Sequence, residues 1–252
     1  MPRQERVRSK SGYYHIMLRG NERKNIFLDE DDKLRFIETI KEKKKEDRFY
    51  LQAICLMDNH IHMMMSEGTE NIAQIIKRIT VSYVYYFNKK YKRIGHLFQD
   101  RYKSEAVEDD NYVLALARYI HQNPIKAGMV ERLEDYKWSS YNGYINKNAY
   151  ISKIIDAEIV LELFSKDRGE ALKKFKEYSN ASYNEPFMDL QEESNDEEKG
   201  REIYKKMLED LGEIQPSEEL IREFRRNTGL SIRRIADITG LNKDKINKII
   251  KS

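Results

Sequence analysis

The chain has 252 residues, of which 40% are hydrophobic and 35% charged, and its formal net charge is +3. A chain of this length can bury a sizeable core and has room for one or two domains. Charges interrupt every long apolar stretch, which excludes a membrane span, and the N-terminus lacks the apolar run of a signal peptide. Cys55 is the only cysteine, which excludes an internal disulfide and a cysteine-based zinc site. These features predict a cytoplasmic protein.

The charge is unevenly distributed along the chain. Residues 1–150 hold 27 Lys and Arg against 21 Asp and Glu, residues 189–219 hold 4 against 12, and residues 220–252 hold 9 against 3. Two basic regions therefore flank an acidic one, which suits two nucleic-acid-contacting units joined by a solvated linker. The alternative is a lysine-rich surface that only keeps the protein soluble, and charge alone does not decide between them.

The hydrophobic pattern of the first part predicts strands and helices in the order β-α-β-β-α-β-α. Apolar runs predict strands over Tyr13–Arg19, Phe49–Met57, Ile61–Met65 and Arg101–Val107. Helical spacing predicts helices over Asp31–Lys45, Ile72–Tyr91 and Asn111–Gln122. Pro124 is expected to end the last of them. No parallel βαβ repeat occurs, so the expected fold class is α+β, an antiparallel sheet with helices on one face.

His60-Ile61-His62 lies at the start of one of these strands. Side chains two residues apart in a strand point to the same face, so the two imidazoles project together while Ile61 packs behind them. Two histidines so placed can chelate one divalent cation. On this motif alone, a solvated pair or one bonded to the backbone remains an alternative. His15 is interpreted as a packed strand residue rather than a ligand.

Tyr119 lies near the C-terminal end of a predicted helix, and Asn123 follows four residues later on the same helix face. The asparagine amide oxygen suits Mg²⁺ or Mn²⁺. His121 is the alternative ligand, but at ~100° per residue its side chain is displaced by ~160° from that of Tyr119. Pro124 disfavours helical geometry at Asn123 and could turn the Asn123 side chain away.

Together these motifs resemble the HUH single-tyrosine transposases, and especially the REP-associated tyrosine transposases. The resemblance covers residues 10–145 and rests on five landmarks in the family's order. They are Tyr14-His15 through Arg19-Gly20-Asn21, Met57-Asp58-Asn59-His60-Ile61-His62, Gly95-His96-Leu97-Phe98-Gln99 with Arg101-Tyr102-Lys103-Ser104, the block Tyr119–Gly128, and Trp138-Ser139-Ser140-Tyr141.

The resemblance implies a ferredoxin-like catalytic domain in which His60 and His62 match the metal-binding pair. Tyr119 matches the nucleophile and Asn123 the third ligand position. It implies cleavage of single-stranded DNA beside hairpins through a 5′-phosphotyrosine intermediate, which conserves the bond for rejoining. Mg²⁺ or Mn²⁺ would polarise the scissile phosphate. Family members include dimers and apparent monomers, so a monomer or a homodimer is expected.

Two other functions remain as alternatives. One is a domesticated DNA-binding regulator that has lost catalysis, although such a protein would not need all of His60, His62, Tyr119 and Asn123. The other is a replication initiator or relaxase-like nickase, which the short catalytic domain and the lack of a helicase segment disfavour. Further cations are candidate contacts to the DNA backbone. They are Arg19, Arg101 and Lys103.

The end of the chain carries a separate signal. Two predicted helices, Ile232–Ile238 and Lys243–Lys251, flank Gly240 and resemble a helix-turn-helix. The second helix would enter the major groove of duplex DNA, although a plain helical hairpin is the alternative. It carries the candidate DNA contacts Lys243, Lys245 and Lys248. The polar stretch 191–198 is expected to be a mobile linker.

The predicted organisation therefore has three parts. They are a catalytic domain over residues 1–150, a helical and acidic linker region over 151–214, and a helix-turn-helix DNA-binding tail over 215–252.

Overall fold

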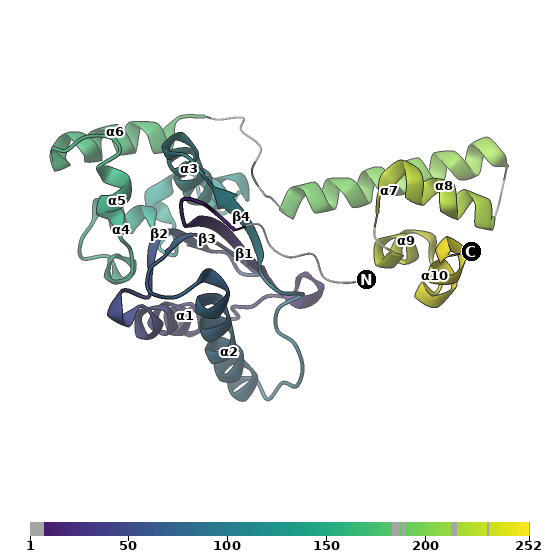
Figure 1. The fold of residues 1–252 in the computed structure, drawn as a ribbon, viewed down its shortest axis with the longest axis horizontal. Coiled ribbons are helices and arrows are strands. Elements are labelled where there is room, and N and C mark those ends of the chain that lie inside the picture. The colour runs from purple at the N-terminus through teal and green to yellow at the C-terminus, as the bar shows by residue number, and fades with distance from the viewer. Residues whose placement is uncertain (1–7, 183–186, 188–189, 213–215, 231, 252) are drawn as a thin grey trace. The chain divides into compact units, whose positions relative to one another are not determined.

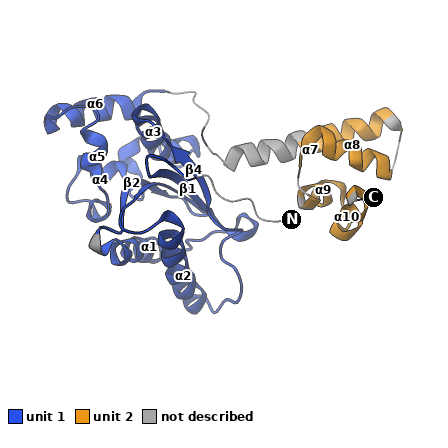
Figure 2. Ribbon diagram, in the orientation of Figure 1, with its two compact units in different colours: residues 1–187 blue, residues 188–252 orange. Residues whose placement is uncertain are grey.

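The computed structural model describes residues 8–182, 187, 190–212, 216–230 and 232–251. The chain forms two compact units, Met1–Phe187 and Met188–Ser252 (Figure 2). The predicted division at residue 150 differs from this boundary, because Ile154, Val160 and Phe175 pack into the core of the first unit. Among the described residues, no helix is long and apolar enough to cross a membrane.

A four-stranded antiparallel sheet forms the centre of the first unit. Its strands are β1 (Tyr13–Arg19), β2 (Phe49–Leu56), β3 (His60–Glu67) and β4 (Lys103–Val107). They lie in the order β2-β3-β1-β4, and all three neighbouring pairs are antiparallel. This is the ferredoxin-like arrangement of a β-α-β-β-α-β chain. The predicted α+β class with a ferredoxin-like sheet is confirmed.

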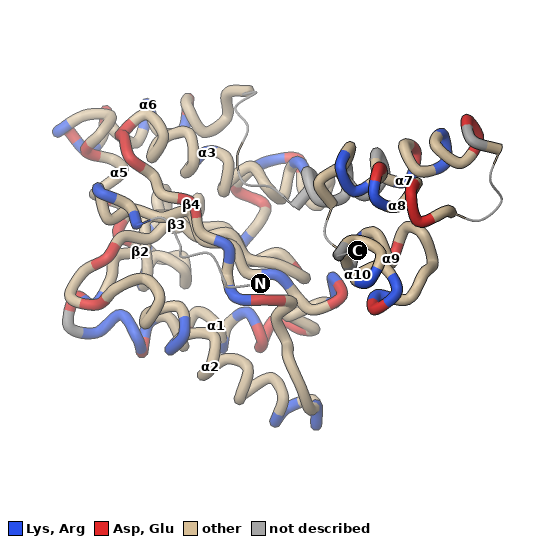
Figure 3. The backbone as a smooth tube through the Cα atoms, turned by 45° about the vertical axis from the view of Figure 1, so that its right-hand side comes forward, with Lys and Arg blue, Asp and Glu red and all other residues tan. Residues whose placement is uncertain are grey.

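Helices cover both faces of the sheet. On one face lie α1 (Glu30–Lys43) and α2 (Ile72–Lys90), and on the other lie α3 (Asp110–Lys126) and α6 (Arg168–Asn180) (Figure 1, Figure 3). The short helices α4 (Tyr141–Ile145) and α5 (Ala157–Leu161) belong to the segment beside β2. Short 3-10 turns lie at Asn21–Arg23, Lys45–Asp47, Leu133–Asp135 and Tyr150–Lys153. The prediction placed helices on one face only, whereas β2 and β3 are apolar on both faces and each face needs a cover.

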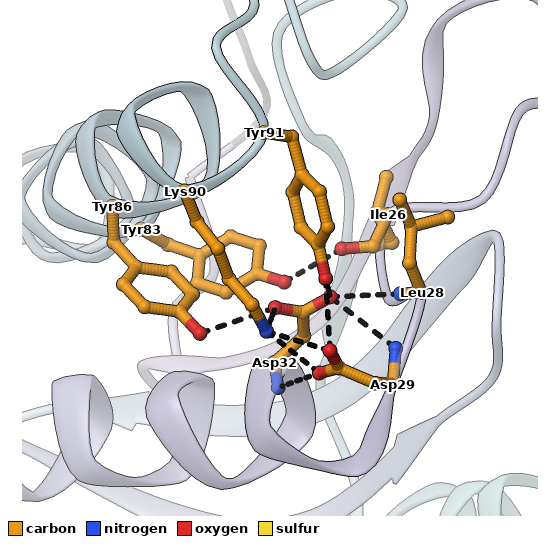
Figure 4. A network of polar contacts seen from close by, with 8 residues as sticks. All are labelled: Ile26, Leu28, Asp29, Asp32, Tyr83, Tyr86, Lys90 and Tyr91. Atoms are coloured by element: carbon orange, nitrogen blue, oxygen red, sulfur yellow. Dashed lines mark hydrogen bonds and ion pairs between the residues drawn. The ribbon is translucent and has the colours of Figure 1, made fainter.

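A polar network ties the start of α1 to the end of α2 (Figure 4). Asp32 is fully buried and forms a capping box with Asp29 at the N-terminus of α1. The Asp32 carboxylate accepts hydrogen bonds of 2.8 Å from the Leu28 N–H, the Tyr91 hydroxyl and the Lys90 ammonium. A second hydrogen bond from Lys90, to Asp29, lowers the pKa of the Asp29 carboxyl. These contacts compensate the cost of burying the Asp32 charge.

Helix α3 continues through Pro124 to Lys126, although the sequence predicted an end before the proline. A proline inside a helix removes one backbone donor and crowds the carbonyl four residues earlier. In the same turn, the Asn123 side-chain amide donates to the Tyr119 carbonyl at 3.0 Å, and the Ala127 N–H donates to the Asn123 carbonyl. Packing of α3 between the sheet and α6 offsets the missing bond.

The second unit consists of α7 (Leu190–Leu211), α8 (Glu218–Thr228), α9 (Ile232–Thr239) and α10 (Lys243–Lys251). The stretch 191–198, predicted as a linker, lies inside α7. Its abundant Glu residues are good helix formers, so polarity alone does not distinguish a helix from a linker. Further along α7, Gly200 packs so closely that a Cβ atom there would lie 2.8 Å from Leu230 and 3.0 Å from Ile238. Helix α7 is therefore part of this unit.

The two last helices occur where the sequence predicted them. Gly240 has a φ of +70° in the turn between α9 and α10, a conformation that favours glycine. The Asn242 side chain accepts a hydrogen bond of 2.8 Å from the Asp244 N–H and so caps α10. The second unit has its own apolar core. It contains Tyr204, Leu220, Ile221, Phe224, Leu230, Ile235, Ile238, Ile246 and Ile249.

Candidate active site

The two histidines of the His60-Ile61-His62 motif lie on β3, a central strand of the sheet. In the β1–β3 register, His60 is opposite Arg19 and His62 is opposite Met17. Alternation of side chains along a strand places both imidazoles on the same face, as predicted. Their ring centroids are 5.1 Å apart. Tyr119 on α3 contacts His62 on this face, with ring centroids 5.4 Å apart.

His62 is completely buried, and its two ring nitrogens have different surroundings. The Nδ1 atom is 3.1 Å from Nε2 of His15 on β1. The Nε2 atom is buried and has no hydrogen-bond partner among the described residues. Burial, together with the nearby His15 and His60 rings, holds the pKa of His62 well below its ordinary value. His62 is therefore a neutral imidazole, which is the form that binds metal ions.

His60 is the first residue of β3, where it is half-buried. Its Nδ1 atom is 2.6 Å from the side-chain oxygen of Asn59, the preceding residue. The Nδ1 atoms of both histidines are thus engaged in hydrogen bonds with neighbouring side chains. In a neutral ring whose Nδ1 donates, Nε2 carries the lone pair that can coordinate a cation.

Tyr119 is only 1% exposed. Besides His62 it contacts His15, with ring centroids 5.8 Å apart, and Phe187 stacks on it at 4.8 Å. The Lys126 ammonium lies 5.1 Å from the centre of the Tyr119 ring. The predicted nucleophile is therefore packed against the histidines on one side and covered by Phe187 on another, with a cation close by.

Asn123 is buried one turn after Tyr119 on α3, and its Nδ2 atom donates to the Tyr119 carbonyl. The proposed ligand Asn123 thus lies one helical turn from the proposed nucleophile Tyr119. His121, the alternative ligand, points into a different environment, where its Nε2 atom is 2.8 Å from the Ser140 hydroxyl. Aromatic rings from α4 and α6 surround His121. They belong to Tyr141, Tyr144 and Phe175.

Two predicted DNA contacts lie on the histidine face of the sheet. Arg19 is directly opposite His60, and Lys103 is opposite Met17, which is itself opposite His62. Lys103 is exposed, as is Arg101 just before β4. The exposed lysines of α10, which were predicted to contact DNA, belong to the second unit. They are Lys243, Lys245 and Lys248.

Three residues of this environment were not assigned to the site from the sequence. His15 was interpreted as a packed strand residue, and it is buried, but it also contacts both His62 and Tyr119. Glu105, opposite His15 in the β1–β4 register, places a carboxylate oxygen 3.8 Å from Nδ1 of His15. His15, Met17 and Arg19 alternate along β1 and so lie on one face of the sheet. This alternation could have predicted that His15 lies on the face of the site. No local signal identifies Phe187.

The donor set fits a divalent ion that accepts both nitrogen and oxygen ligands. The buried Nε2 of His62, without a partner among the described residues, is the atom that a metal ion would satisfy. No group of three His, Cys, Asp or Glu side chains that could hold a metal ion occurs in the described part of the chain. The predicted ligand set accordingly consists of two imidazoles, His60 and His62, and the amide of Asn123.

Residues 8–123 match the family model described as "Transposase IS200 like". The predicted resemblance to this family is therefore confirmed over residues 8–123.

Individual proteins are also similar to this chain. A REP-associated tyrosine transposase of Haemophilus influenzae is 30% identical over 114 residues, which cover 40% of this chain and 64% of the relative. The match thus spans less than two thirds of the length of that curated relative. A solved structure of a REP-associated tyrosine transposase bound to a REP hairpin is 20% identical, with a TM-score of 0.49. That match covers 60% of this chain and 88% of the solved chain.

Proposed function

We propose that this chain is a metal-dependent endonuclease and strand transferase that acts on single-stranded DNA. Tyr119 is the nucleophile, and His60, His62 and Asn123 hold Mg²⁺ or Mn²⁺. The observation that carries the proposal is the contact of the Tyr119 ring with His62, whose buried Nε2 has no partner among the described residues. Tyr119 would therefore attack the same phosphate group that the metal ion on His62 contacts.

The chemistry follows from a phenol placed beside a phosphodiester. The Tyr119 oxygen forms a bond to phosphorus, its proton is lost, and the bond from phosphorus to the 3′ oxygen breaks. The 3′ oxygen takes up a proton and leaves as a hydroxyl, while the 5′ phosphate stays on the tyrosine. Attack of a 3′-hydroxyl on this phosphotyrosine reverses the step and rejoins a strand. A bound divalent ion would neutralise charge that develops on the phosphate.

Cations of the first unit position the DNA backbone in this proposal. Arg19 and Lys103 lie on the face of the sheet that carries the histidines, so a strand bound there would pass close to Tyr119. Lys126 adds a positive charge beside the Tyr119 ring. The substrate that the motif resemblance suggests is a single strand flanking a hairpin. A cytoplasmic location and a monomeric or homodimeric state remain part of the same proposal.

The test is formation of a covalent adduct with single-stranded oligonucleotides from the DNA that flanks the coding sequence. We expect Tyr119→Phe to abolish the adduct on a denaturing gel and to leave DNA binding largely intact, because only the phenol oxygen is lost. Tyr141→Phe is the matched control, since Tyr141 is also a buried tyrosine but packs on His121 outside the site. An adduct that persists in Tyr119→Phe would assign the nucleophile elsewhere.

Binding without any adduct in the wild-type protein would favour the alternative, a DNA-binding regulator without catalysis. The test should include Mn²⁺ and Mg²⁺, and a chelator in a parallel reaction. Loss of the adduct on chelation, with recovery on adding back the ion, is the expected result for a metal-dependent reaction.

A further inference from the structure

The buried contact between His15 and His62 raises a question that the His-x-His motif alone does not pose. A neutral histidine carries one ring proton, on either Nδ1 or Nε2, and only the bare nitrogen can bind a metal ion. In the 3.1 Å contact between Nε2 of His15 and Nδ1 of His62, either ring could donate. The direction of this one hydrogen bond decides whether His62 can act as a ligand.

The two directions have opposite consequences. If His15 donates from Nε2, the proton of a neutral His62 must lie on its own Nε2, and the buried nitrogen is blocked. If His62 donates from Nδ1, its Nε2 keeps a bare lone pair. The second arrangement requires that the proton of His15 lie on Nδ1.

Glu105 favours the second arrangement. Its carboxylate oxygen lies 3.8 Å from Nδ1 of His15, within ion-pair distance, so its negative charge stabilises a proton on that nitrogen. His15 and Glu105 are opposite each other in the β1–β4 register, which fixes the approach of the carboxylate. A hydrogen bond between the Tyr112 hydroxyl and Glu105 holds the carboxylate from the side of α3.

We propose that Glu105 and His15 are positioning residues that fix the tautomer of His62, so that its Nε2 faces the metal ion with a lone pair. The chain runs from Glu105 on β4 through His15 on β1 to His62 on β3. Asn59 has the corresponding role for His60, because its side-chain oxygen accepts a hydrogen bond from Nδ1. This inference rests on the proposed function, because it concerns the same metal site.

The direct test is NMR of the histidine side chains, in which the nitrogen–proton coupling pattern identifies the protonated nitrogen of each ring. In the metal-free wild-type protein we expect His62 to be protonated on Nδ1. In His15→Leu, which removes the acceptor, and in Glu105→Gln, which removes the charge, we expect a population with the proton on Nε2. His15→Gln offers an amide oxygen as a substitute acceptor and should retain most of the Nδ1 form.

Mn²⁺ affinity, measured by electron paramagnetic resonance on the full chain, is the second readout. Loss of an outer-sphere partner of a metal-bound histidine weakens binding by about 10- to 100-fold, which is the expected effect of His15→Leu. His15→Gln should bind more tightly than His15→Leu. Gln52→Leu is the matched control, because it also removes a fully buried polar side chain of the sheet, one that bonds to Ser66 at the other end of β3, and it should leave Mn²⁺ affinity unchanged.

The outcomes separate the inference from the proposed function. If His15→Leu and Glu105→Gln keep both the wild-type tautomer and the wild-type Mn²⁺ affinity, while His62→Ala loses binding, the positioning role is overturned and the metal site stands. If the wild-type protein binds no Mn²⁺ and His62→Ala changes nothing, the proposed metal site fails, and the inference fails with it. Glu105→Gln keeps the test decisive should His15→Leu not fold, since the Glu105 side chain is 41% exposed.

Discussion

Two polar residues of the same helix, His121 and Asn123, show how far helix geometry decides a residue's role. They lie two positions apart on α3, and their side chains are directed to different sides of it. Asn123 bonds back to the carbonyl of Tyr119, whereas His121 bonds to Ser140 among aromatic rings. The rotation of ~100° per residue separates the two environments in spite of Pro124.

We expect Asn123→Ala to raise the Mn²⁺ concentration needed for strand cleavage substantially, because it removes an oxygen ligand that shares the turn of Tyr119. His121→Leu should leave that concentration nearly unchanged. A titration of cleavage against Mn²⁺ for both variants checks this. The reverse order of the two effects would transfer the ligand role to His121.

The burial of His121 leads to a separate prediction, about how the free energy of unfolding depends on pH. Burial lowers the pKa of His121 to about 3, from an ordinary value of 6.5. As the pH falls through 6.5 the unfolded chain takes up a proton at this residue, while the folded protein does so only near pH 3. The free energy of unfolding should therefore decrease on acidification through this window, by up to about 1.4 kcal/mol per pH unit for this residue.

Urea denaturation of the wild-type protein and His121→Leu at a series of pH values measures this contribution by difference. The other titrating groups are common to both proteins, so the difference isolates His121. A stability difference between the two proteins that does not change from pH 6.5 to pH 4 would contradict a neutral, buried His121.

Residue identities in the site were predictable to different degrees. The spacing of His60 and His62 on a strand, and of Tyr119 and Asn123 on a helix, follows from local periodicity. The role of His15 does not, because it depends on a hydrogen bond to a residue 47 positions away. Phe187 was missed for the same reason, since its contact with Tyr119 joins segments that are far apart in the sequence.

At the scale of the elements, packing overrides local preference in α3 and α7. Proline stops an isolated helix, yet α3 runs through Pro124 because it is packed between the sheet and α6. The polarity of residues 191–198 predicted a linker, yet these residues are helical within α7, which packs on α8 and α9. Hydrophobic periodicity and polarity therefore predicted where most helices and strands lie. The ends of these elements, and the faces of the sheet that they cover, depend on contacts with segments distant in the sequence.

The polar network between α1 and α2 can be tested through its central carboxylate. Asp32→Asn removes the buried negative charge that accepts from Lys90 and Tyr91, and leaves Lys90 only the more exposed Asp29. Breaking a buried ion pair from one side is strongly destabilising, so we expect a loss of about 3 kcal/mol in the free energy of unfolding.

Asp31→Asn is the matched control, because Asp31 is the adjacent residue in the same first turn of α1 but is exposed. Guanidinium denaturation of both variants gives the comparison. Equal effects of the two substitutions would mean that the network adds no more than the charge at the helix N-terminus.

At the scale of the whole molecule, the chain consists of an α+β unit and a helical unit with separate cores. The predicted tail boundary at residue 215 would cut the second unit, since α7 contributes Tyr204 to its core. A truncation intended to remove this unit should therefore end at residue 187. The DNA-binding role of the second unit remains a prediction, supported by its basic residues and by the two helices on either side of Gly240.

We expect the triple substitution of Lys243, Lys245 and Lys248 by Gln, in the full chain, to weaken DNA binding and to make it less sensitive to salt. Each lost phosphate contact should lower the slope of log affinity against log salt by about 0.7–0.9. Cleavage of a short single strand should be spared. Substitution of Lys173, Lys174 and Lys176 on α6, which are also exposed, is the matched control. An unchanged slope would make the last helices a structural or protein-binding element.

The order of the site residues along the chain has a consequence for how the protein is made. His15 lies on the first strand, His60 and His62 on the third, and Tyr119 on a helix that follows the fourth. The contacts of His62 with His15 and with Tyr119 therefore close long loops, which form late in folding compared with local helix contacts. While the chain is emerging from the ribosome, His15, His60 and His62 are made before Tyr119. The site cannot form until α3 has been made and has packed on the sheet. The strand-cutting capacity proposed for the finished protein is thus withheld from every chain that ends before α3.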